Sequence, residues 1–102
     1  QAMPAFSHQI EKAIKRQDLL SMNHRSSEFF ASYFDLLFAL NEQTHPGEKR
    51  MLEYAKANCT LLPKQFEETI RDYFLLLYQP QQGKQAVVTL QTILKELKAI
   101  LP

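Results

Sequence analysis

The chain has 102 residues, 45% of them apolar, which is enough for one hydrophobic core and too little for two, so residues 1–102 are expected to form a single domain. Twelve basic residues nearly balance eleven acidic ones, so the net charge of +1 gives no strong nucleic-acid signal and no electrostatic field that would hold an anionic membrane. No apolar run approaches the roughly 20 residues that span a bilayer. The single cysteine, Cys59, excludes an internal disulfide and a cysteine-based metal cluster and suits the reducing cytoplasm, where we expect the protein to reside.

The first two predicted helices flank a stretch in which the helical apolar period is weak. The first helix is expected to start near Ser7, whose hydroxyl can accept a hydrogen bond from an unpaired backbone N–H, just after Pro4. Between Leu20 and Ser26 the apolar period fades, which indicates either a tight loop or a kink. From Ser26 to Asn41 the period returns in an aromatic-rich helix that is apolar except for a narrow polar stripe. Such a helix belongs in the middle of a bundle.

Prolines are expected to open the next two helices. Pro46 should stand in the first turn of the third helix and Pro63 in the first turn of the fourth, because proline is pre-organised for that position. Cys59 lies on the apolar edge of the third helix, which indicates a buried structural thiol. The last helix should run from about Lys84 to Leu101. The short connections favour antiparallel neighbours, and together these patterns predict an all-α fold, a four- to five-helix up-and-down bundle around the second helix.

The end of the fourth predicted helix is apolar almost all round. This part is therefore either deeply buried or in contact with another chain or domain. In the second case the candidate interface residues are Tyr73, Phe74, Leu76 and Tyr78.

Catalytic templates are largely missing from the sequence. The three histidines, His8, His24 and His45, show none of the spacings that place two metal ligands on one helix face. With only two glycines there is no glycine-rich phosphate loop. We therefore expect no catalytic residues, no metal site and no cofactor on this domain.

The cluster with the best functional prospects surrounds the start of the third predicted helix. A helix N-terminus near Pro46 would present free N–H groups and the positive end of the helix dipole to an anion such as a phosphate. The candidate substrate-binding residues are Asn41, His45, Lys49 and Arg50. The alternative is a capped helix with two solvated cations.

The same stretch resembles a known family. Phe38-Ala39-Leu40-Asn41, followed after a short gap by Pro46-Gly47-Glu48-Lys49-Arg50 and Met51-Leu52, is similar to the helical domain that follows the catalytic domain in nucleotidyltransferases related to kanamycin nucleotidyltransferase. In that group a Leu-Asn ends one helix and a Pro-x-x-Lys opens the next. Asp18 and Leu61-Leu62-Pro63 also fit, so the resemblance covers roughly residues 10 to 78.

The resemblance implies an accessory substrate-binding domain that is not catalytic alone. Its partner would be a nucleotidyltransferase catalytic domain, fused or separate, which would hold Mg and a nucleoside triphosphate. The chain would then be a piece from the C-terminal part of a longer nucleotidyltransferase, with Asn41 and Lys49 facing the substrate cleft. A helical ribonuclease family uses an Arg followed four to six residues later by His, but seven residues separate Arg16 from His24, so that motif is not met.

An interaction protein is the alternative from a different class. A self-standing helical module would homodimerise through its aromatic helix faces, above all through the end of the fourth helix. An upstream Gly-Ser turn with an Asp-x-Asp pair would favour the accessory domain over this module.

Overall fold

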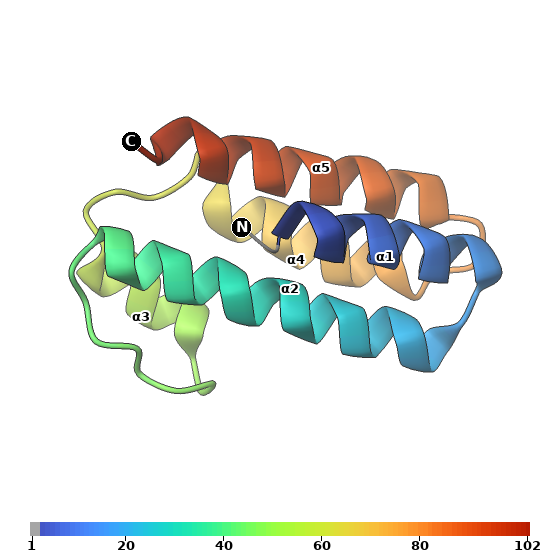
Figure 1. Ribbon diagram of the computed structural model, residues 1–102, viewed down its shortest axis with the longest axis horizontal. Coiled ribbons are helices and arrows are strands. Elements are labelled where there is room, and N and C mark those ends of the chain that lie inside the picture. Colours follow the sequence, from blue (N-terminus) through green and yellow to red (C-terminus); the bar gives the residue numbers. More distant parts are fainter. Residues whose placement is uncertain (1–2) are drawn as a thin grey trace.

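The computed structural model describes residues 3–102, and within them the chain forms five α-helices and no strand (Figure 1). The helices are α1 (Met3–Arg16), α2 (Leu19–Leu40), α3 (Met51–Asn58), α4 (Phe66–Leu77) and α5 (Gly83–Ile100). The predicted all-α bundle is confirmed. None of these helices is both long and apolar enough to cross a membrane.

Four of the helices make the bundle, and α3 is inserted in the connection between α2 and α4. Along the chain α1, α2, α4 and α5 alternate in direction, so the bundle has up-and-down topology (Figure 1). The helices pack most closely in the pairs α1 with α2 and α4 with α5, and α1 also packs on α5. The helix α3 lies at one end of the bundle, where it flanks α2 (Figure 1).

An aromatic seam joins α2 to α4. It consists of Phe30, Tyr33 and Phe34 on α2 with Phe66, Tyr73 and Phe74 on α4. The ring centroid of Phe30 lies 5.7 Å from that of Tyr73 and 5.3 Å from that of Phe74. Tyr33 stacks on Phe66 with a centroid distance of 6.3 Å. Rings at these separations contribute beyond their buried area and fill the space between the two helices. The predicted aromatic face of the second helix is thus buried. The prediction that this helix lies in the middle of the bundle is wrong, because Ser27, Ala31 and Asp35 form an exposed outer face.

One polar contact is buried inside the seam. The hydroxyls of Ser26 and Tyr73 lie 2.7 Å apart, and both side chains are almost completely inaccessible to solvent. Burial raises the pKa of Tyr73 to about 12. Each hydroxyl is the hydrogen-bond partner of the other, so neither is a buried polar group without a partner. The contact also fixes the position of α2 along its axis relative to α4.

The first two helices start earlier than predicted. The helix α1 begins at Met3, so Pro4 stands in its first turn, and the hydroxyl of Ser7 donates to the Pro4 carbonyl at 3.0 Å instead of capping the helix. The helix α2 begins at Leu19, where Asp18 is the N-cap and accepts a hydrogen bond from the Ser21 N–H at 3.3 Å. The weak stretch before Ser26 is therefore helix, preceded by a tight turn.

The next two helices start later than predicted, because each is preceded by a residue with left-handed backbone. The helix α3 begins at Met51, after Gly47 with φ of 93° and Arg50 with φ of 54°, so the prediction that it opens at Pro46 is wrong. The helix α4 begins at Phe66, after Gln65 with φ of 53°, and not at Pro63. Positive φ is incompatible with a helical turn. The predicted span of α5 and the burial of Cys59 are confirmed.

Candidate functional site

The loop before α3 and the segment after it are both attached to the end of α2. The side-chain amide of Asn41 donates to the carbonyls of Leu37 and Leu61, both at 2.9 Å, and its oxygen accepts from the Leu61 N–H at 2.8 Å. Asn41 therefore fastens the segment after α3 to the last turn of α2. These contacts give Asn41 a structural role, where the resemblance implied a cleft-facing one.

Phe38 of α2 contacts both the loop before α3 and α3 itself. Its buried ring meets His45 edge to face at a centroid distance of 5.3 Å and Tyr54 of α3 at 5.6 Å. The His45 Nδ1 accepts from the Gly47 N–H at 3.0 Å, and its Nε2 lies 3.6 Å from an oxygen of Asp35. His45 thus holds the loop between α2 and α3 in place by both ring nitrogens and by its ring edge.

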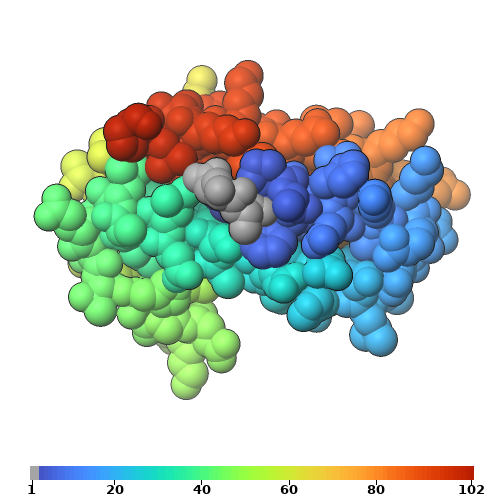
Figure 2. Space-filling view, in the orientation of Figure 1, coloured from blue at the N-terminus to red at the C-terminus, as the bar shows by residue number. Residues whose placement is uncertain are grey.

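Lys49 and Arg50 stand at the exposed end of this loop, and we call these two residues the basic turn. Residues of this stretch form a green lobe that projects from the bundle (Figure 2). Within residues 3–102, neither cation takes part in an ion pair. Arg50 is the N-cap residue of α3 but its side chain does not cap the helix. The helix start predicted near Pro46 lies instead at Met51, and the two cations predicted there, Lys49 and Arg50, are exposed.

A groove runs from the basic turn along the outside of α2 and α4. It encloses about 790 Å³, a size typical of binding sites. Its lining includes Phe30 and Phe34 of the seam, Met51 of α3 and Leu75 of α4, with Arg50 and Arg71 among its polar residues. Of the four predicted substrate-binding residues, the groove includes only Arg50, which it brings together with Phe74 from the predicted interface. A groove built by three helices has no signature in the sequence.

The predicted interface residues divide into buried and exposed ones. Tyr73 is inaccessible and Leu76 is half-buried in the core, so Tyr73 cannot contact another chain. Phe74 is 41% exposed, Tyr78 47% and their neighbour Leu75 65%. The exposed apolar surface of α4 is thus formed by Phe74, Leu75 and Tyr78.

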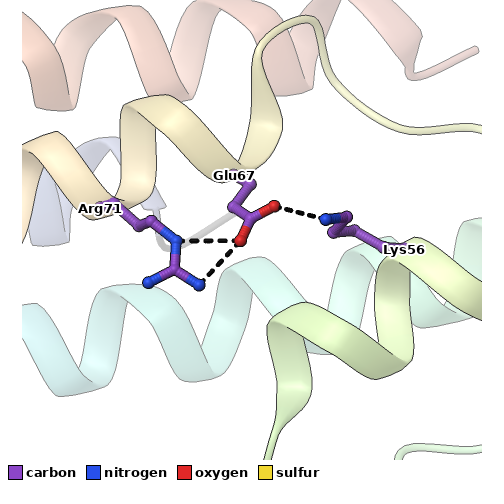
Figure 3. Close-up of polar contacts among 3 residues, drawn as sticks. All are labelled: Lys56, Glu67 and Arg71. Carbon is purple, nitrogen blue, oxygen red and sulfur yellow. Dashed lines mark hydrogen bonds and ion pairs between the residues drawn. The ribbon is translucent and has the colours of Figure 1, made fainter.

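An ion-pair cluster ties α3 to α4 beside the groove (Figure 3). Glu67 accepts a hydrogen bond from the Lys56 Nζ at 2.6 Å and from the Arg71 Nε at 2.9 Å, and a second Arg71 nitrogen lies 2.7 Å away. The hydrogen bond from Lys56, followed by that from Arg71, lowers the pKa of Glu67 below its usual range. The hydrogen bond to Glu67 likewise raises the pKa of Lys56. The sequence showed Glu67 and Arg71 at helical spacing, but not that Lys56 would join them.

In the part of the chain that the structure describes, no three His, Cys, Asp or Glu side chains gather as a metal site would require. The thiol of Cys59 is buried, and burial raises its pKa, which makes it a poor nucleophile. Comparisons of the chain with protein-family models, with curated proteins and with solved structures found no match.

Proposed function

We propose that this chain is an accessory substrate-binding helical domain of a nucleotidyltransferase and is not catalytic alone. It works beside a catalytic domain, fused or separate, which holds Mg and the nucleoside triphosphate. The observation that supports this most is the link that His45 makes between the two resemblance segments. Its ring packs on Phe38 and its Nδ1 accepts from the Gly47 N–H, which fixes the loop that displays Lys49 and Arg50 to α2. The cytoplasm, with its nucleoside triphosphates and reducing conditions, is the compartment that belongs with this proposal.

The proposed role of the basic turn is electrostatic. Two adjacent cations without anionic partners in residues 3–102 raise the local concentration of a negatively charged substrate or leaving group. Because Asn41 and His45 anchor the loop on either side, the charges are pre-positioned and little ordering is needed on binding. Lys49 and Arg50 therefore position substrate, and Asn41 and His45 support them.

The chain provides a matched control for this role. Lys64 and Gln65 precede α4 in the same way that Lys49 and Arg50 precede α3: an exposed lysine is followed by a residue with φ near that of Arg50, at a helix start without a side-chain cap. Substituting glycine at either left-handed position relieves the same backbone strain. Only the substitution at Arg50 also removes a cation from the proposed site.

The experiment reconstitutes nucleotide transfer from this chain and a nucleotidyltransferase catalytic domain encoded upstream in the same gene or in a neighbouring one. Transfer is expected only when both are present, and the K49A/R50G double variant should raise the KM for the acceptor at least about tenfold. The K64A/Q65G double variant should behave as wild type. Transfer that does not depend on the chain, or equal losses in both double variants, would refute the proposal.

A second candidate function, a self-standing interaction module, is favoured by the exposure of Phe74, Leu75 and Tyr78. The two functions use different residues and are compatible in one chain.

A further inference from the structure

The outer face of α4 carries a compact apolar patch with a cation at one end. Arg71, Leu75 and Tyr78 follow one another at spacings of four and three, so they share a helix face, and Phe74 lies beside Leu75. We call these four residues the α4 patch. All four are exposed, although large apolar side chains on α4 would normally be covered. The patch also forms part of the wall of the groove, whose lining includes Arg71, Phe74 and Leu75.

Both ends of the α4 patch are held in place by contacts inside the chain. Arg71 bonds Glu67 through its Nε and one terminal nitrogen, which fixes the plane of the guanidinium group. The Tyr78 hydroxyl donates to the Asn23 side-chain oxygen on α2 at 3.1 Å, which fixes the direction of the ring. A partner that binds here meets two side chains that need little further ordering.

We infer that the α4 patch binds a second copy of this chain, with the two α4 helices packed antiparallel across a two-fold axis. If the axis passes between Phe74 and Leu75, each Phe74 faces the partner's Leu75. Arg71 then lies opposite the partner's Tyr78, and Tyr78 opposite the partner's Arg71. A guanidinium group over a tyrosine ring is a favourable cation–π contact, and the symmetry forms it twice.

The choice of a second copy as occupant follows from this internal complementarity. The α4 patch has an apolar centre, a cation at one end and an aromatic ring at the other. In an antiparallel pair the cation of each copy meets the aromatic ring of the other, so the patch is complementary to itself. The groove between α4 and the start of α3 leaves room for the partner's apolar side chains. Arg50 of the basic turn also lines this groove, but no contact of the proposed dimer uses its charge, so the inference goes beyond the proposed function and does not depend on it.

The exposed apolar area is large enough for a dimer interface of standard size. Leu20 is 84% exposed and precedes Asn23, the residue that holds Tyr78, by one helical turn, so it extends the patch onto α2. At roughly 200 Å² for a fully exposed large side chain, Leu20, Phe74, Leu75 and Tyr78 together present on the order of 450 Å². A standard interface buries about 800 Å² on each partner, somewhat more than half of it apolar. The α4 patch together with Leu20 supplies that apolar share.

The test is sedimentation equilibrium of the whole chain from roughly 1 µM to roughly 1 mM. Wild type is expected to show a monomer–dimer equilibrium that the L75E variant weakens at least about tenfold. The matched control is V88E, because Val88 is 54% exposed on α5, outside the patch. Circular dichroism of each variant should show unchanged helix content, since neither side chain belongs to the core.

Two further measurements test the symmetry. An equimolar mixture of L75E and L75K should associate more tightly than either variant alone, because the two-fold axis brings the two copies of position 75 together. The Y78F variant keeps the aromatic ring and should dimerise, whereas R71E should not. The K56A variant removes the other cation that contacts Glu67 and so controls for loss of the ion-pair cluster of Lys56, Glu67 and Arg71. A wild type that stays monomeric throughout, association that continues beyond the dimer, or equal weakening by L75E and V88E would overturn the inference.

Discussion

Asn41 and Leu61 lie 20 residues apart in the chain and exchange two hydrogen bonds, one in each direction between the Asn41 side chain and the Leu61 backbone. The side-chain amide thereby substitutes for a backbone strand and closes the loop that contains α3. The loop carries the basic turn, so this clasp connects the stability of the fold to the proposed site.

The Asn41→Ala variant is expected to lower the free energy of unfolding by about 1–2 kcal/mol, because the bonds to Leu37 and Leu61 are lost while water replaces part of them at this half-exposed position. Urea denaturation followed by circular dichroism measures the change. Asn58→Ala is the control, since the Asn58 side chain makes only a local bond to the Tyr54 carbonyl. Equal stability of the two variants would show that Asn41 does not fasten the loop and would return it to the candidates for substrate contact.

Ser26 and Tyr73 provide a second prediction, because their hydroxyls depend on each other inside the aromatic seam. Ser26→Ala and Tyr73→Phe should each destabilise the protein by about 1–3 kcal/mol, since each leaves one buried hydroxyl without a partner. The double variant removes both hydroxyls and should cost less than the sum of the single changes. A double-mutant cycle of thermal or urea unfolding measures this coupling, and strict additivity would mean that the hydroxyls do not interact.

The sequence was sufficient for the class of fold and for the aromatic helix face that fills much of the core, because apolar spacing and aromatic content depend on local chain geometry alone. It misplaced the starts of four helices for identifiable reasons. At both ends of the stretch from Leu19 to Ser26 the usual polarity is reversed, because Leu19 and Leu20 are exposed and Ser26 is buried against Tyr73. Tertiary contacts cause this reversal, so it cannot be predicted from the period of apolar residues along the sequence.

The candidate site was predicted only where local chemistry determines it. Lys49 and Arg50 were expected near a turn and are exposed in one. The helix start expected at Pro46 fails because Gly47, with φ of 93°, leaves the helical region at once. The groove, the clasp between Asn41 and Leu61 and the link from Lys56 to Glu67 join residues from separate helices or loops, and pairings at such separations cannot be derived from one sequence.

Gly83 provides a third prediction, at the point where the start of α5 approaches α1. A Cβ atom at this position would stand 2.8 Å from the Cγ2 methyl of Ile14, closer than side-chain carbons approach each other. Gly83→Ala is therefore expected to destabilise the protein by about 1–2 kcal/mol, although alanine favours helices. The Ile14→Ala background removes the clashing methyl and should reduce the cost of the glycine substitution. Thermal unfolding of the four proteins checks this, and an unchanged cost in that background would assign the effect to the backbone.

Glu67 provides the last prediction, a pH dependence that follows from its lowered pKa. A carboxylate whose pKa is lower in the folded than in the unfolded chain contributes stability above its unfolded value, which is ordinarily 4.5, and this contribution is lost as pH falls through the lowered value. Glu67→Gln should therefore reduce stability near neutral pH and flatten the loss of stability on acidification. The effect is expected to be small because the cluster is largely exposed to solvent and is screened by salt.

Glu68→Gln is the neighbouring control, as Glu68 is exposed and lies outside the ion pairs described for residues 3–102. Urea denaturation between pH 3 and pH 7, at roughly 0.02 M and 0.5 M salt, separates the two variants. An acid limb of the same slope in wild type and Glu67→Gln would mean that Lys56 and Arg71 do not bias the ionisation of Glu67, and that the contact between α3 and α4 rests on apolar packing alone.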